Sequence, residues 1–211
     1  MKSLFIDTST KTLTIAILEN NKLLSNKTSE TTNEHSKYAL DLLKKAFDET
    51  LIKPNEIEKI FVINGPGSFT GVRIGVTIAK TYAWALEKKL VPISSLFAHA
   101  LSYDGYDYYV SLLDARRGFV YAAIYDREYN FILKEQYISI VELNGAIEKL
   151  NGSIIIIGDI SINYSESSPL VLDVPKIITH CKDYKTVPAH SLKPNYLKRV
   201  EAEEKLMAEN K

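Results

Sequence analysis

The chain has 211 residues, 45% of them hydrophobic, which is enough to bury the core of one large domain or of two small ones. Its 26 basic and 26 acidic residues leave no net charge, so the composition carries no electrostatic sign of a nucleic-acid-binding protein. The single cysteine, Cys181, excludes an internal disulfide and suits a reducing compartment.

The sequence also argues against export and membrane insertion. The apolar run before Asp7 is far too short for the apolar region of a signal peptide. The longest apolar stretch, residues 72–86, is interrupted by Arg73 and Lys80 and cannot span a bilayer. We therefore expect a cytoplasmic protein with no membrane contact.

Hydrophobic patterning predicts a first half that mixes strands and helices. The predicted elements, in chain order, are strands at 3–7, 12–19 and 22–29, a helix at 34–49, a strand at 59–64, a helix at 69–88, a strand at 90–93 and a helix at 95–101. Asn20 and Asn21 predict a hairpin turn, and Asn33 is the expected N-cap of the first helix. The first three strands are therefore expected to be antiparallel neighbours.

A glycine-rich stretch, NGPGSFTGVRIG at residues 64–75, connects a strand to the longest apolar helix. Gly65 and Gly67 can adopt positive φ, and Ser68 is a good N-cap. Such a turn directs backbone N–H groups and the positive end of a helix dipole into one space, which suits an anion. Gly65, Gly67, Ser68 and Gly71 are thus candidates for a nucleotide or phosphate loop.

The same stretch departs from both common phosphate-binding templates. It lacks the lysine and the hydroxyl of a Walker A loop, because Val72 and Arg73 follow Gly71. Its third glycine lies one residue beyond the dinucleotide-binding frame. A closely packed strand-to-helix turn is therefore the alternative.

The helix predicted at 69–88 is apolar on more than one side. One side is expected to pack on its own sheet. The other then requires a second helix, a second domain or a second chain to cover it.

The order of elements repeats after a polar stretch at 104–107. The predicted elements of the second half are strands at 108–114, 119–125 and 131–139, a helix at 141–150 and a strand at 153–157. This order predicts a duplicated α/β architecture with subdomains 1–103 and 104–211 on either side of a cleft. In the tail we expect a weak strand at 176–179 and a charged helix at 201–209 that could pack back on the first subdomain.

Two aspartates end the first strand of each half. Asp7 and Asp114 could form a carboxylate pair for magnesium and phosphate chemistry, or each could cap a tight hairpin. Arg116 and Arg117 follow Asp114 in a predicted hairpin turn. Their guanidinium groups could clamp a phosphate or a partner carboxylate, or lie in solvent at the tip of the hairpin with Gly118.

The sequence predicts no metal site. Its histidines, at positions 35, 99, 180 and 190, have no metal-ligand spacing, and no paired cysteine motif occurs. For His35, near the start of the first helix, a partner contact or a simple surface role is more natural than metal binding.

Four stretches resemble the TsaB (YeaZ) family, the bacterial accessory proteins for threonylcarbamoyladenosine (t6A) modification of tRNA. They are LFIDTST at 4–10, GPGSFTGVRIG at 65–75, DARRGFVY at 114–121 and PNYLK at 194–198. The resemblance implies an actin-like fold, related to sugar kinases and Hsp70, made of two ribonuclease-H-like subdomains. The chain departs from the family in being short between Gly158 and Pro194 and in having Lys198 where arginine is usual.

The resemblance also implies a protein that is not itself an enzyme. It would pair with the catalytic subunit TsaD and the ATPase TsaE, which together transfer threonylcarbamoyl to N6 of adenosine 37, and it would reach tRNA only through that complex. No cofactor and no metal site follow from the resemblance, which is compatible with weak ATP or ADP binding but does not imply it. An actin-fold ATPase or a small-molecule kinase is the alternative function.

Family members form homodimers or pair with TsaD through the two helices of the first subdomain, which here are 34–49 and 69–88. The residues that this resemblance assigns to a partner interface are His35, Tyr38, Leu42, Thr70, Arg73, Ile74, Thr77, Ile78 and Thr81.

Overall fold

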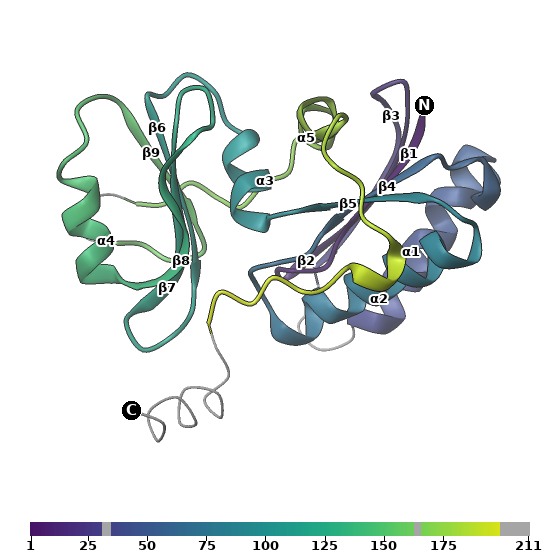
Figure 1. Cartoon of the computed structure of the whole chain (residues 1–211), viewed down its shortest axis with the longest axis horizontal. Coiled ribbons are helices and arrows are strands. Elements are labelled where there is room, and N and C mark those ends of the chain that lie inside the picture. Colours follow the sequence, from purple (N-terminus) through teal and green to yellow (C-terminus); the bar gives the residue numbers. More distant parts are fainter. Residues whose placement is uncertain (31–34, 163–165, 199–211) are drawn as a thin grey trace. The chain divides into compact units, whose positions relative to one another are not determined.

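The structure of the chain is a computed structural model that describes residues 1–30, 35–162 and 166–198. It divides into two compact units (Figure 1). Unit 1 comprises Met1–Gly105 and Pro169–Asn195, and unit 2 comprises Tyr106–Ser168 and Tyr196–Lys211. Among the described residues, no helix is both long and apolar enough to cross a membrane.

Unit 1 is built on a five-stranded sheet in the order β3-β2-β1-β4-β5. The strands are β1 (Lys2–Asp7), β2 (Thr12–Glu19), β3 (Lys22–Glu30), β4 (Lys59–Ile63) and β5 (Lys89–Ile93). β1 pairs antiparallel with β2 and parallel with β4. The hairpin between β2 and β3 turns at Asn20 and Asn21, which have φ of 49° and 64°. These angles are typical of the two-residue hairpin turn that the sequence predicted.

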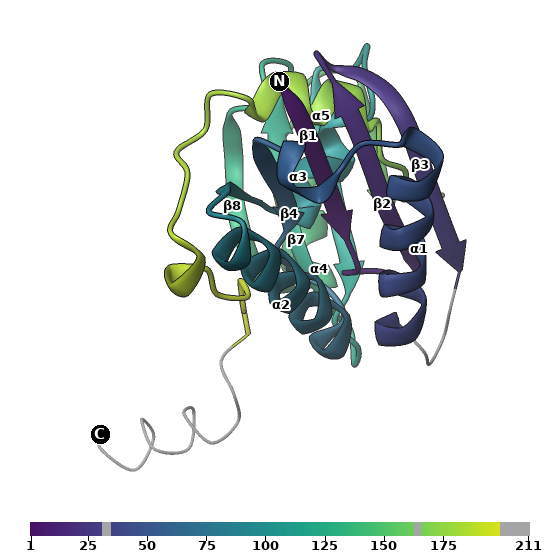
Figure 2. The same ribbon diagram turned by 90° about the vertical axis from the view of Figure 1, so that its right-hand side faces the viewer.

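The helices of unit 1 are α1 (His35–Thr50), α2 (Phe69–Ala85), α3 (Ser95–Leu101) and α5 (Val174–Cys181), with short 3₁₀ turns η1 (Pro54–Glu56) and η2 (Ala189–Ser191). α1 and α2 contact each other and lie on one face of the sheet (Figure 2). α5 contacts both α3 and β3.

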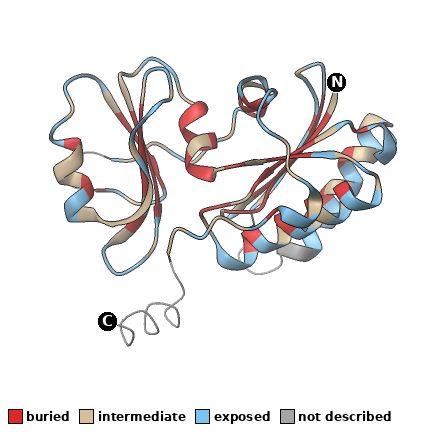
Figure 3. Cartoon of the chain, in the orientation of Figure 1, coloured by how far each residue is buried: buried red, intermediate tan, exposed pale blue. Residues whose placement is uncertain are grey.

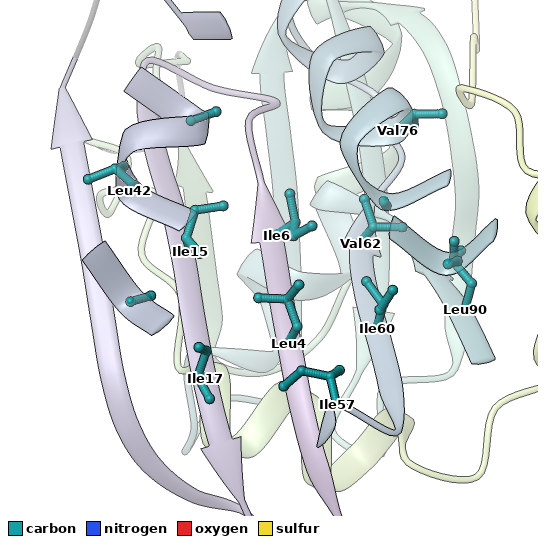
Figure 4. Close-up of a cluster of buried hydrophobic side chains, with 14 of the residues drawn as sticks. Leu4, Ile6, Ile15, Ile17, Leu42, Ile57, Ile60, Val62, Val76 and Leu90 are labelled. Atoms are coloured by element: carbon teal, nitrogen blue, oxygen red, sulfur yellow. The ribbon is translucent and has the colours of Figure 1, made fainter. Parts of the chain in front are cut away.

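The main core of unit 1 lies between the sheet and the two long helices. Alternate residues of a strand point to the same face. Leu4 and Ile6 of β1 therefore meet Val76 and other apolar residues of α1 and α2 (Figure 4). Strands β1, β2, β4 and β5 and the inner sides of both helices are mostly buried, whereas the edge strand β3 and the outer sides of the helices are largely exposed (Figure 3).

Unit 2 repeats this arrangement with fewer parts. Its four-stranded sheet has the order β8-β7-β6-β9, formed by β6 (Tyr108–Asp114), β7 (Phe119–Asp126), β8 (Phe131–Ser139) and β9 (Ile154–Gly158). β6 pairs antiparallel with β7 and parallel with β9, as β1 does with β2 and β4. One helix, α4 (Ile140–Ile147), packs on one face. The chain therefore has the duplicated ribonuclease-H-like α/β fold that was predicted.

The tail differs most from the prediction. The strand predicted at 176–179 is wrong, because these residues lie in α5. The N-cap Asp173 accepts a hydrogen bond from the backbone N–H of Lys176 at 3.0 Å, and Pro175 stands in the first turn. Both features favour the start of a helix, but the strand was predicted from the β-branched residues of the same segment.

Three boundaries also need correction. The segment Pro169–Asn195, which was expected in the second subdomain, belongs to unit 1. α2 ends at Ala85 rather than at 88, since Glu87 has a left-handed φ of 51° that a helix cannot contain. α4 spans Ile140–Ile147 rather than 141–150. The predicted N-cap Asn33 and the predicted helix 201–209 lie outside the described residues.

Candidate functional site

The glycine-rich stretch forms the turn between β4 and α2. Gly65 and Gly67 have φ of 108° and 155°, as their positions in the predicted turn required. Ser68 is the N-cap of α2, and its side chain accepts a hydrogen bond from the backbone N–H of Gly71 at 3.2 Å. The backbone N–H of Ser68 donates to the carbonyl oxygen of Ser9 at 2.7 Å. Two of the amides that a phosphate would need are therefore already bonded.

The glycines of this turn are packed against the segment that follows β1. A Cβ atom added at Gly67 or Gly71 would lie less than 3.0 Å from a backbone oxygen of Ser9 or Thr8, closer than real Cβ atoms come to any neighbour. The Thr8 hydroxyl donates to the carbonyl oxygen of Gly71 at 2.6 Å. The missing side chains allow two backbone segments to touch. Of the two interpretations from sequence, this geometry favours the closely packed turn.

Asp7 lies at the end of β1 and is 1% exposed. Its Oδ1 accepts a hydrogen bond from the backbone N–H of Ser9 at 2.7 Å, while Oδ2 has no hydrogen-bond partner among the described residues. Burial raises the pKa of Asp7, and the bond from Ser9 and the nearby His99 lower it by less. A carboxyl whose charged form is disfavoured by burial is a poorer ligand for a magnesium–phosphate group.

Asp114 ends the equivalent strand of unit 2 and is exposed. Its Oδ1 accepts a hydrogen bond from the backbone N–H of Arg116 at 2.7 Å, and its own N–H donates to Oδ1 of Asp159 at 2.9 Å. The carboxylate therefore holds the hairpin turn. Asp7 and Asp114 belong to different units, so their use as a pair stays a prediction. Among the described residues, no three His, Cys, Asp or Glu side chains are grouped to hold a metal ion.

The outer side of α1 and α2 carries two hollows that meet at Leu40. We call this surface the helix groove. One hollow, of about 400 Å³, is lined by Leu40, Phe69, Thr70, Arg73, Ile74, Thr77 and Ile78. The other, of about 500 Å³, is lined by Leu40, Leu43, Lys44, Phe47, Asp48, Leu51, Ile52, Lys53, Pro54 and Tyr82. An open apolar groove of this length is typical of a protein interface.

The groove brings together five of the residues expected at an interface, of which Thr70, Arg73 and Thr77 are exposed and Ile74 and Ile78 are half-buried. Tyr38 and Thr81 are exposed but do not line the groove. Leu42 was assigned wrongly, because its side chain is 8% exposed and packs in the core under α1. His35 begins α1, but its side chain lies outside the described residues.

Sequence reasoning missed three large apolar side chains on this side of the molecule. Leu40, Phe69 and Trp84 are 57%, 55% and 78% exposed. Phe69 also lies under the Arg73 guanidinium, whose carbon is 3.7 Å from the ring centroid. The available signal was an apolar residue outside the stripe that faces the sheet, which on a helix indicates a second contact surface.

Comparison with known proteins places the chain among tRNA-modifying proteins. The family model described as TsaD, tRNA N6-adenosine threonylcarbamoyltransferase, matches residues 22–172. The chain is 29% identical to the tRNA threonylcarbamoyladenosine biosynthesis protein TsaB of Bacillus subtilis over the full length of both proteins. It is 32% identical to TsaB of Escherichia coli over 63% of this chain and 58% of that protein.

A solved structure shares the fold. It is a crystal structure of a Pseudomonas aeruginosa protein described as uncharacterised and similar to the peptidase YeaZ, and it superposes with a TM-score of 0.75. The match covers 93% of this chain and 99% of that one at 21% identity. At this identity the likeness concerns the fold alone.

Proposed function

The chain belongs to the family of the tRNA N6-adenosine threonylcarbamoyltransferase model and, within it, to the TsaB (YeaZ) proteins, and we propose that it is a non-catalytic subunit in t6A synthesis. In this role it binds the catalytic subunit TsaD and works with the ATPase TsaE. In the absence of TsaD, two copies of the chain cover the same surface as a homodimer. The chain is then a scaffold and activator that reaches tRNA through the complex.

The helix groove is the observation that carries this proposal. Leu40, Phe69 and the half-buried Ile74 and Ile78 expose apolar surface that costs free energy in water, at about 25 cal/mol per Å². Thr70, Thr77 and Arg73 give the groove a polar border on α2. A second helix pair laid into it would complete a helix bundle with an apolar centre and a polar edge.

The geometry around Asp7 also argues for a scaffold rather than an ATPase or kinase. The glycine turn is packed against Thr8 and Ser9, and the backbone N–H groups of Ser68 and Gly71 already donate to protein oxygens. One observation favours the alternative, namely the unbonded and buried Oδ2 of Asp7. Calorimetric titration with ATP and magnesium separates the two functions. We expect weak or no binding, and tight binding would favour the enzyme.

The direct test is reconstitution of t6A synthesis from purified components. TsaD, TsaE, tRNA and a supply of threonylcarbamoyl-adenylate are combined with and without this chain. We expect modification only when the chain is present, and no turnover by the chain alone. Equal modification in its absence would remove the proposed role.

The groove itself is tested by Thr77→Glu. Thr77 is exposed, so the variant should fold, but in an assembled interface the new carboxylate would be buried without a partner. Such a charge costs about 3 kcal/mol or more, which weakens association at least a hundredfold. Ile74→Asp should act in the same way. Val141→Glu, at a position of unit 2 that is 80% exposed, is the matched control. Unchanged sedimentation of Thr77→Glu, alone and with TsaD, would mean that the groove is not the interface.

A further inference from the structure

The turn between β6 and β7 has an unusual backbone. Arg116, Arg117 and Gly118 have φ of 67°, 56° and 77°, so three consecutive residues are left-handed. Glycine adopts this conformation without penalty, and asparagine does so more readily than other residues. Two arginines are therefore costly choices here, and a residue held in an unfavourable conformation is often kept for its side chain.

Both arginine side chains are exposed at the tip of the hairpin. Among the described residues, none forms an ion pair with either guanidinium group. Asp114, the nearest carboxylate in sequence, is bonded instead to the backbone N–H of Arg116. The Asp114 carboxylate and the backbone hydrogen bonds among Ala115, Arg116 and Phe119 hold the backbone of the turn, from which the two guanidinium groups extend.

A row of aromatic side chains begins directly after the turn. Phe119 stacks on Tyr137 of β8, with ring centroids 4.7 Å apart and ring planes within 5°. Tyr121 lies opposite Tyr137 across the β7–β8 ladder and contacts its ring at 5.9 Å. The Lys198 ammonium nitrogen lies 5.1 Å from the centroid of Tyr137.

These side chains share one face of the sheet. Phe119 and Tyr121 are two residues apart on β7, whereas Val120 and Ala122 point to the opposite face, which α4 covers. Phe119, Tyr121 and Tyr137 are half-buried, so part of each ring reaches solvent. The turn with its two guanidinium groups directly precedes the aromatic row of β7 with its neighbouring ammonium group, and together they make up one candidate surface. We call it the arginine–aromatic surface.

We propose that the arginine–aromatic surface binds an unpaired nucleotide of an RNA, with its phosphate on Arg116 and Arg117 and its base against the Phe119 ring. Guanidinium groups match phosphate oxygens in geometry and charge, and unpaired bases stack on aromatic side chains in single-stranded RNA recognition. An acidic peptide would use the arginines but not the rings. The choice of RNA over a free nucleotide rests on the proposed function in tRNA modification.

The charge of the rest of unit 2 gives RNA no general attraction to this part of the chain. Acidic residues outnumber basic ones between residues 106 and 168, so nonspecific attraction of RNA to the unit is not expected. Binding should therefore be weak and should depend on the two arginines.

The test is a double variant that removes the charges and improves the turn. Arg116→Asn with Arg117→Asn keeps the left-handed backbone with better-suited residues. The full chain is titrated into a fluorescently labelled, unmodified tRNA transcript, and anisotropy is followed at several salt concentrations. We expect at least tenfold weaker binding, a salt-dependence slope lower by about 0.7 for the one lost phosphate contact, and an unchanged or higher midpoint of urea unfolding.

Arg127→Ala is the matched control. Arg127 lies in the turn at the opposite end of β7, where it pairs with Asp107, and its loss should leave RNA binding unchanged. RNA binding by the double variant equal to that of the wild type would overturn the proposal. Competition by polyglutamate or by AMP that is as effective as competition by RNA would also overturn it, because the site would then bind carboxylates or free nucleotides.

This assay contains no TsaD, so it can fail while the proposed function stands. If the isolated chain binds RNA through these arginines but is dispensable in the reconstituted reaction, the surface is retained and the scaffold role is lost. If reconstitution requires the chain but the double variant binds RNA normally, the scaffold role stands and the RNA site is rejected.

Discussion

The glycine turn allows one consequence to be worked out in full, namely the effect of Gly71→Ala. Gly71 lies in the first turn of α2, where alanine would normally favour the helix by about 1 kcal/mol. Here the new methyl group would be closer than 3.0 Å to the carbonyl oxygen of Thr8, so the start of α2 must move away from the segment after β1.

The cost follows from the contacts that would break. Moving α2 strains the bond from the Thr8 hydroxyl to Gly71 at 2.6 Å and the bond from the Ser68 N–H to Ser9 at 2.7 Å. Each is worth about 1 kcal/mol, and overpacking adds about 1–3 kcal/mol. Less the gain in helix propensity, the net loss of stability is about 2–4 kcal/mol.

Urea unfolding followed by circular dichroism measures this loss, and hydrogen exchange of the α2 amides locates it. Gly145→Ala in α4 is the control, because a Cβ added there would meet nothing within 4 Å. That variant should be as stable as the wild type or gain up to about 1 kcal/mol. If Gly71→Ala is also as stable as the wild type, the turn is not closely packed and a phosphate loop becomes the better interpretation. If the Gly71→Ala variant is destabilised, its association with TsaD should also weaken, because α2 lines the helix groove.

Three further predictions concern single side chains. Burial raises the pKa of Asp7 above its usual value of 3.8, so the native state holds this proton more tightly and its stabilisation is lost as the pH rises from about 3.8 through the raised pKa. Asp7→Asn should remove this dependence and be more stable at pH 7, and an unfolding series at pH 4–8 that gives parallel curves for the two proteins would contradict it. Leu42→Ala should lower stability by about 2–4 kcal/mol in urea unfolding, whereas Leu40→Ala, at an exposed position of the groove, should cost under about 1 kcal/mol and instead weaken the complex with TsaD in sedimentation. Burial raises the pKa of the Cys181 thiol to about 12, so a colorimetric thiol reagent at pH 8 should leave the folded chain unmodified and react once urea is added.

Local patterns predicted the elements of unit 1 well because its signals are short-range. Asn20 and Asn21 carry the β2–β3 turn by their own backbone preference, and Ser68 caps α2 through a residue three positions away. The error at 176–179 came from weighting Ile177 and Ile178 for strand propensity. Their burial in α5 shows tertiary packing deciding between two structures that the sequence allows.

The site was harder to predict because it depends on contacts between distant residues. The spacing of the apolar residues of α1, Leu42 among them, indicates an amphipathic helix. It does not say which of these residues the sheet covers. The packing of Thr8 on Gly71 joins residues 63 positions apart, and no local sequence pattern predicts it. The return of Pro169–Asn195 to unit 1 likewise has no signature in composition or spacing.

Two aspartates at equivalent positions of the duplicated fold differ in burial, and the elements around them explain the difference. Asp7 and Asp114 end the corresponding strands of two sheets with the same order, but α2 follows β4 whereas, in the described part of residues 159–168, no helix follows β9. In unit 1 the start of α2 closes over the turn after β1, so Asp7 is buried and its charge is disfavoured. In unit 2 the corresponding turn is exposed, so Asp114, Arg116 and Arg117 all lie at the surface. The start of α2 packs over the turn after β1, and the same helix carries one wall of the helix groove. In the described part of unit 2 no such helix covers the corresponding turn, which is the physical reason why the two units are proposed to recognise different partners, a protein helix pair and an RNA.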